Sequence, residues 1–132
     1  MILVVDSSTV VAGLSDSGPV GRWAEDILAS GGLAAPHLVL VEAANIFRRA
    51  QHAGQLSADT ASLAHQDLLS LRLDLFPYEP FARRVWDLRQ NLTAYDAWYV
   101  ALAEFLDAPL VTLDARLARA SGPRCAFELP PA

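Results

Sequence analysis

Four acidic side chains with apolar neighbours are the residues of this chain best suited to chemistry. Asp6 and Asp114 each end an apolar run, in ILVVD and APLVTLD, whereas Glu42 lies within LVEAANIF and Asp96 within TAYDAWYVALAE. Carboxylates gathered from remote segments are the oxygen ligands that Mg²⁺ and Mn²⁺ prefer in proteins. We refer to these four residues as the acid cluster, and the first question is whether the fold brings them together.

Each aspartate of the acid cluster also has a simpler explanation. Asp6 could hold a turn with the two serines that follow it, Asp114 could cap the next helix, and Asp96 could form a T-x-x-D capping box with Thr93. Glu42 has no such role, because an acid on an apolar helix face needs a buried partner and the arginines at 48 and 49 lie too far along the helix. Local capping therefore explains single acids, and the joint pattern needs another reason.

The elements that must position the acids alternate between strands and helices. Apolar runs at 2–6 and 109–114 predict parallel strands buried on both faces, and further strands are expected at 32–36, 72–78 and, at an edge, 125–129. Helical spacing and capping signals predict helices at 9–14, 19–30, 38–52, 56–71, 81–91, 93–107 and 115–121. The sequence therefore predicts one domain over residues 1–132, an α/β/α sandwich in three layers with a mainly parallel central sheet.

In such a fold the carboxyl ends of the parallel strands and the amino ends of the returning helices share one edge, where the acid cluster is expected. Two carboxylates about 5 Å apart at an effective dielectric near 20 repel by roughly 3 kcal/mol, so a cluster needs compensation. The chain has no lysine, and Arg116 is the only arginine within two residues of any of the four acids. A divalent cation is the simplest remedy, and its bound water is a nucleophile for phosphodiester attack.

Two hydroxyl side chains are expected to support the acids. Ser8 follows Asp6 by two residues, and Thr112 precedes Asp114 by two, which places it on the same strand face. Histidines 37, 52 and 65 have no metal-ligand spacing. The chain contains no G-x-S-x-G, P-loop or G-x-G-x-x-G motif, so the hypothesis does not depend on another nucleophile or on a nucleotide cofactor.

Composition limits the remaining possibilities. A length of 132 residues suffices for one hydrophobic core, and the single Cys125 allows neither an internal disulfide nor a zinc ligand set. The formal net charge of −5 argues against binding nucleic acid through bulk positive potential, although all ten basic residues are arginines, which suit phosphate. The first residues lack the basic region of a signal peptide, and no apolar run is long enough to span a bilayer, so a cytoplasmic location is expected.

These segments resemble the PIN-domain ribonucleases, particularly the VapC-type toxins of bacterial toxin-antitoxin pairs. VVDSS is similar to the first-strand aspartate motif of that family, LVEAANIF to its helical glutamate segment, and TAYDAWYVALAE with APLVTLD to its most recognisable region. The resemblance covers nearly the whole chain and implies that the acid cluster holds the metal, with Ser8 and Thr112 in support. Some relatives carry another acid shortly after the last aspartate, but here Arg116 and Leu117 follow.

The resemblance implies an activity and partners. The activity is Mg²⁺-dependent, or Mn²⁺-dependent, endoribonuclease cleavage of RNA, and a cognate antitoxin silences it by binding near the acidic cleft. A homodimer is also implied. Apolar positions that could form dimer contacts, or pack in the core, are Val10, Val11, Leu14, Trp23 and Ile27.

Contacts to RNA phosphates, and two alternative functions, stay open at this point. Arginines that could rim the cleft, or lie on solvated helix faces, are Arg48, Arg49, Arg83, Arg84 and Arg116. The main alternative is a non-catalytic module of the same fold whose acidic pocket binds a partner peptide through an Arg or Lys. A phosphoacceptor receiver domain also uses strand-end acids and Mg²⁺, but it requires a lysine that this chain lacks.

Overall fold

The computed structural model describes residues 1–132 and contains a five-stranded sheet in which every pairing is parallel. The strand order is β3-β2-β1-β4-β5, with β1 in the centre. The strands are β1 (Leu3–Val5), β2 (Leu33–Pro36), β3 (Leu73–Phe76), β4 (Leu110–Val111) and β5 (Phe127–Glu128). The predicted parallel sheet is therefore confirmed, and the segment expected at an edge, which contains β5, does lie there.

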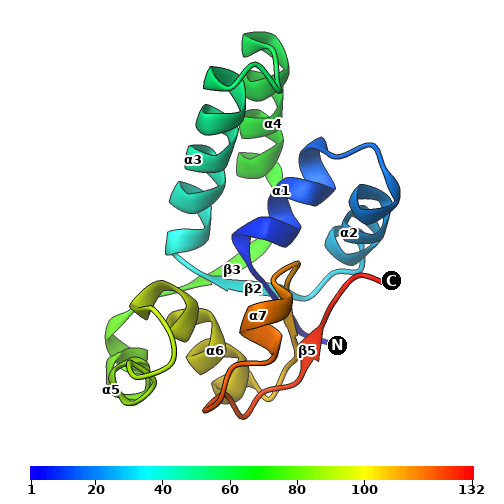
Figure 1. Cartoon of the computed structure of the whole chain (residues 1–132). Helices are drawn as coiled ribbons and strands as arrows, with labels where there is room; N and C mark the ends of the chain where they lie inside the picture. Colours follow the sequence, from blue (N-terminus) through cyan, green and yellow to red (C-terminus); the bar gives the residue numbers. More distant parts are fainter.

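Helices flank the sheet on both sides, as predicted. They are α1 (Ser7–Ser15), α2 (Pro19–Ala29), α3 (Leu38–His52), α4 (Ala58–Ser70), the 3₁₀ turn η1 (Glu79–Phe81), α5 (Ala82–Asp87), α6 (Ala94–Leu106) and α7 (Ala115–Ala118). Helices α1 to α4 lie on one side, where α3 and α4 form a hairpin that extends away from the sheet, and α5 and α6 lie on the other (Figure 1). No helix is both long and apolar enough to cross a membrane.

The core lies between the central strands and the helices on either side. All three residues of β1 are buried, and α6 contributes a nearly continuous buried run from Tyr99 to Ala103. Val10, one of the positions considered for dimer contacts, is fully buried and belongs to this core. The other four positions, Val11, Leu14, Trp23 and Ile27, are partly buried against it.

Several elements are shorter than the sequence predicts. The expected helix over 81–91 ends at Asp87, because the amide of Leu88 bonds to the carbonyls of both Arg84 and Val85 and tightens the last turn. The expected strand over 109–114 ends at Val111, where the hydroxyl of Thr112 accepts the amide of Asp114 at 3.0 Å and turns the chain. The early end of β4 places the hydroxyl of Thr112 beside Asp6.

Candidate active site

Asp6 follows β1 and is held almost entirely by protein groups. Its Oδ1 accepts the hydroxyl of Ser8 at 2.7 Å and the amide of Thr9 at 3.0 Å, which caps α1, and its Oδ2 accepts the hydroxyl of Thr112 at 2.5 Å. The side chain is only 8% exposed. Burial raises the pKa of the Asp6 carboxyl, and the bonds from Thr112, Ser8 and Thr9 oppose that rise.

The turn from β4 to α7 meets Asp6 through the two hydroxyls that the sequence singled out. The amide of Leu113 donates to Ser8 Oγ at 3.1 Å, and Thr112 accepts from the amide of Asp114 while it donates to Asp6. Asp114 itself caps α7, since its Oδ1 accepts the amides of Arg116 and Leu117. Ser8 and Thr112 therefore join the ends of two neighbouring strands.

Asp96 lies in the first turn of α6, where its backbone amide donates a hydrogen bond of 3.1 Å to the hydroxyl of Thr93. Burial raises the pKa of the Asp96 carboxyl, and the charges of Asp114 and Asp6 raise it further, whereas Thr93 and Arg116 lower it. The helical cap that the sequence predicts is present. The charges of Asp114 and Asp6 act on Asp96 in addition to this cap.

Glu42 points from α3 toward α6, where it meets a buried tyrosine. The hydroxyl of Tyr99 donates to Glu42 Oε1 at 2.6 Å, and Tyr99 is only 2% exposed. Burial raises the pKa of the Glu42 carboxyl, the Tyr99 bond lowers it, and the charges of Asp96 and Asp6 raise it. Burial and the bond to Glu42 together raise the pKa of Tyr99, so the phenol keeps its proton and acts as the donor.

Sequence reasoning missed three polar residues beside the acid cluster. Tyr99 is the donor to Glu42, Ser7 also lowers the pKa of Glu42, and the fully buried Thr9 donates to the carbonyl of Val111. Tyr99 had a readable signal, because residues three apart on a helix share a face and it follows Asp96 by three. Ser7 and Thr9 flank Ser8 in a run of hydroxyl residues, but Ser7 was considered only for a turn and Thr9 only as the start of the helix over 9–14.

No arginine forms an ion pair with any of the four acids, although Arg116 lies close enough to lower the pKa of Asp96. The only ion pair in the structure joins Arg84 to Glu104, away from the cluster. No group of three or more His, Cys, Asp or Glu side chains is arranged to hold a metal ion, and carboxylate oxygens of Asp6, Glu42 and Asp114 accept hydrogen bonds from protein donors. The donor set is all oxygen, which fits a hard divalent cation and not zinc.

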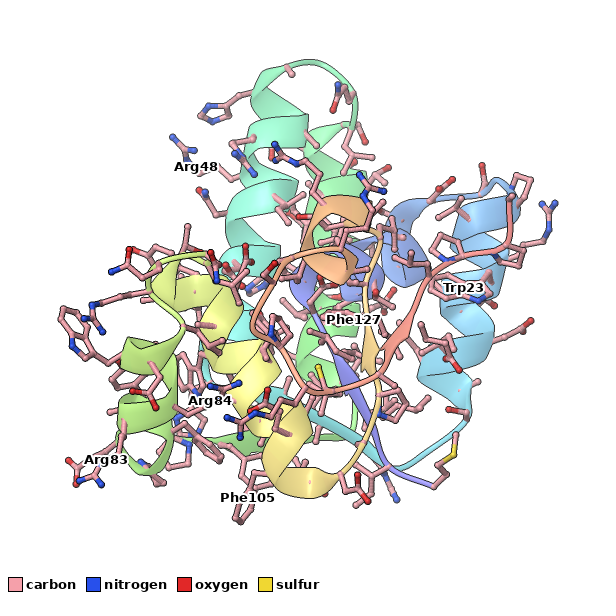
Figure 2. The ribbon with its side chains drawn as sticks, turned by 60° about the horizontal axis from the view of Figure 1, so that its bottom comes forward. Trp23, Arg48, Arg83, Arg84, Phe105 and Phe127 are labelled. Atoms are coloured by element: carbon pink, nitrogen blue, oxygen red, sulfur yellow. The ribbon has the colours of Figure 1, made fainter.

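The five arginines considered for RNA contacts are spread over the molecule. Arg48 and Arg83 project outward from α3 and α5 (Figure 2), and Arg48 Nη1 contacts Asn45 at 3.4 Å. Arg49 is exposed in the last turn of α3. Arg116 is the one that adjoins the acid cluster, in a pocket of about 270 Å³ that Asp96 also lines.

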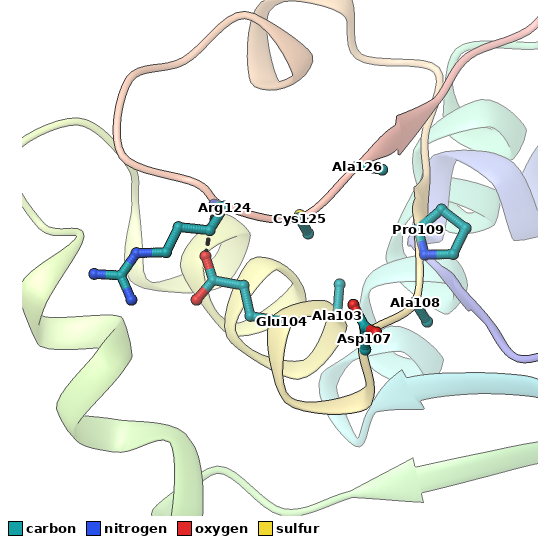
Figure 3. Close-up of a pocket in the computed structure, with 8 residues that line it drawn as sticks. All are labelled: Ala103, Glu104, Asp107, Ala108, Pro109, Arg124, Cys125 and Ala126. Carbon is teal, nitrogen blue, oxygen red and sulfur yellow. Dashed lines mark hydrogen bonds between the residues drawn. The ribbon is translucent and has the colours of Figure 1, made fainter.

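Arg84, which could have lain at the cleft rim or on a solvated helix face, is instead bound to other protein groups. It binds Glu104 through two bonds of 2.7 and 3.0 Å and the carbonyl of Gly122 at 2.9 Å. Glu104 follows Asp96 by eight residues on α6, which is about 12 Å along the helix axis. It also accepts the amide of Arg124 at 2.8 Å, beside the pocket drawn in Figure 3. Arg84 therefore fastens α5 and the C-terminal segment to α6.

Comparison with known proteins identifies similar sequences over the whole length. The chain matches the PIN domain over residues 3–123. It is 39% identical over 127 residues to "Ribonuclease VapC1" of Mycobacterium tuberculosis, covering 96% of each chain. It is 37% identical over 130 residues to "Ribonuclease VapC9" of the same organism, covering 98% of this chain and 99% of the relative.

Solved structures share the fold. PAE2754 from Pyrobaculum aerophilum superposes with a TM-score of 0.72 at 26% identity, covering 96% of this chain and 83% of that one. VapC20 of M. tuberculosis, described as a "Sarcin-Ricin loop cleaving toxin", superposes with a TM-score of 0.68 at 16% identity, covering 89% of this chain and 93% of that one. FitAcB from Neisseria gonorrhoeae superposes with a TM-score of 0.69 at 18% identity, covering 98% of each chain.

Proposed function

The chain belongs to the PIN-domain family, as a ribonuclease of the VapC type, and we propose that it is a Mg²⁺- or Mn²⁺-dependent endoribonuclease. In this proposal Asp6, Glu42, Asp96 and Asp114 hold the metal, and the protein is the toxin of a type II toxin-antitoxin pair. The observation that supports the proposal is that acids from remote segments meet at one edge of the sheet. Thr112 bonds both to Asp6 and to the amide of Asp114, and Asp96 lines the same pocket as Asp114.

The protein's own groups prepare the site for this chemistry. A bound divalent cation supplies activation of water and neutralisation of charge on the phosphodiester. Ser8 and Thr112 orient the Asp6 carboxylate, and Tyr99 orients Glu42 through Oε1. Because burial disfavours the charged carboxylates, a cation that pairs with them gains more here than at an exposed site.

The proposed partners are inferred from similar proteins and not from the geometry of the site. Structures similar in fold include a "Toxin-antitoxin complex from Klebsiella pneumoniae" and FitAB bound to a DNA fragment. By analogy, this protein binds a cognate antitoxin that covers the acid cluster, and it forms a homodimer. The substrate is RNA, since the similar mycobacterial proteins are named ribonucleases.

Cleavage of a fluorescent single-stranded RNA by wild type and Asp96→Asn tests the proposal. Wild type is expected to cleave with Mg²⁺ or Mn²⁺ and to stop in EDTA, whereas Asp96→Asn cleaves at least a hundredfold more slowly while its circular dichroism is unchanged. Cleavage by folded Asp96→Asn at the wild-type rate would refute the proposed role of the acids. A wild-type protein that binds a basic peptide but neither takes up metal nor cleaves RNA would favour the peptide-binding alternative.

A further inference from the structure

One pocket joins the acid cluster to polar and apolar groups that the proposed chemistry does not use. It has a volume of about 270 Å³ and lies between the segment leading into α6 and the start of α7. Its lining residues are Asn91, Leu92, Thr93, Asp96, Asp114, Arg116, Leu117 and Ala120. The pocket therefore has two site acids, one cation, one amide and an apolar surface.

Arg116 is the cation best placed to act beside the acids. Its side chain is exposed and belongs to no ion pair, so its guanidinium donors are free for a ligand. It lines the pocket together with Asp96 and Asp114. An unpaired guanidinium next to the proposed metal ligands is suited to a phosphate group, two oxygens of which it can contact in a bidentate manner.

The rest of the pocket suits the base or ribose attached to such a phosphate. The partly buried Leu92 and the buried Leu117 form an apolar wall of the pocket. Asn91 and Thr93 are exposed beside this wall and offer hydrogen-bonding groups. An asparagine amide both donates and accepts, which matches the edge of a nucleobase. A pocket slightly smaller than the roughly 300–1,000 Å³ of drug-sized ligand sites has room for one nucleotide and not for folded RNA.

We propose that this pocket is a nucleotide subsite, in which Arg116 binds a phosphate next to the scissile bond and Asn91 contacts the attached base. The inference rests on the proposed ribonuclease function and adds a specificity determinant to it. Arg116 raises affinity for any RNA, because phosphate contacts carry no sequence information, whereas Asn91 sets a preference at one position.

The chain offers matched controls for both residues. Arg119 is exposed on the same short segment as Arg116 but does not line the pocket, and Gln90 is the exposed neighbour of Asn91, also outside it. Binding of a fluorescent single-stranded oligoribonucleotide is measured by anisotropy in EDTA at several salt concentrations. Arg116→Ala is expected to weaken binding roughly five- to tenfold and to reduce the salt slope by about 0.7, and Arg119→Ala is expected to change neither.

Sequencing the ends of products from a random RNA pool tests the base contact. Asn91→Ala is expected to relax base preference at one position beside the cleavage site, and Gln90→Ala is expected to keep the wild-type pattern. The subsite is refuted if wild type cleaves RNA but Arg116→Ala behaves like Arg119→Ala, or if Arg116→Ala weakens only antitoxin binding. A wild-type protein that cleaves no RNA with Mg²⁺ or Mn²⁺ refutes the proposed function itself, so the two failures are distinguishable.

Discussion

The hydroxyl of Tyr99 gives the most direct test of how the protein prepares Glu42. Replacing Tyr99 with Phe keeps the buried ring and removes only the donor that lies 2.6 Å from Glu42 Oε1. A hydrogen bond to a charged group contributes about 1.5–3 kcal/mol, and water replaces part of it at the half-buried Glu42, so we expect a loss of about 1–2 kcal/mol. For a domain of this size that loss lowers the melting temperature by roughly 3–10 °C.

The bond also orients a proposed metal ligand, so the change should reach beyond stability. Loss of a group that orients a ligand typically weakens metal binding by roughly 10–100-fold. Calorimetric titration of Mn²⁺ into the metal-free protein measures this effect independently of RNA cleavage. We expect weaker Mn²⁺ binding by Tyr99→Phe even at temperatures where the variant is fully folded.

The chain supplies two matched controls, because it has three tyrosines. The rings of Tyr78 and Tyr95 are exposed, and Tyr78 packs edge-on against Trp98 at 5.3 Å between ring centroids. Tyr78→Phe and Tyr95→Phe remove hydroxyls that make no bond to another residue, so wild-type stability and Mn²⁺ affinity are expected. If Tyr99→Phe matches these controls in both measurements, the argument for an oriented Glu42 is wrong.

Three further predictions follow from the structure. Folding raises the pKa of three acids of the cluster, so the metal-free folded state binds more protons than the unfolded state. The free energy of unfolding is therefore expected to fall as pH rises from about 4 through the raised pKa values. In Asp96→Asn this fall in the free energy of unfolding should be less steep. Thr112→Val removes a buried hydrogen bond to Asp6 and should lower the free energy of unfolding, measured in urea, by about 1.5–3 kcal/mol. An unfolding free energy equal to that of wild type would contradict this prediction. Gly21→Ala should be poorly folded by circular dichroism, because its Cβ would lie 1.7 Å from the carbonyl oxygen of Asp16, and a wild-type spectrum and melting temperature would refute this close approach.

The order of the elements was predictable because apolar periodicity and capping residues both mark them. The helix over 38–52 was predicted at its observed bounds, with Pro36 before it and Gly54 after it. The helix over 81–91 was predicted too long, because Val85 and Leu88 keep helical spacing while the backbone after Asp87 turns through shared hydrogen bonds. A pattern of side chains does not report such local tightening.

The edge of the sheet at which Asp6 and Asp114 lie was predictable from the parallel topology. In a parallel sheet the ends of neighbouring strands lie at one edge, so the segments that follow β1 and β4 had to meet, and Thr112 bonds both to Asp6 and to the amide of Asp114. The bond from Tyr99 to Glu42 depends on how α3 and α6 lie relative to each other, which no local pattern specifies. The ion pair of Arg84 with Glu104 could not be predicted, because the two residues are 20 apart in sequence and the fold alone brings them together.

Uptake of a divalent cation by the acid cluster is the central claim, and titration of Mn²⁺ into the metal-free protein tests it most directly. Wild type is expected to bind Mn²⁺ and to gain about 2.7 kcal/mol of stability at a free concentration one hundred times the Kd. Asp6→Asn and Asp96→Asn are expected to lose both the heat of binding and the gain in stability. A wild-type protein that takes up no divalent cation, or variants that bind it as tightly as wild type, would contradict the account.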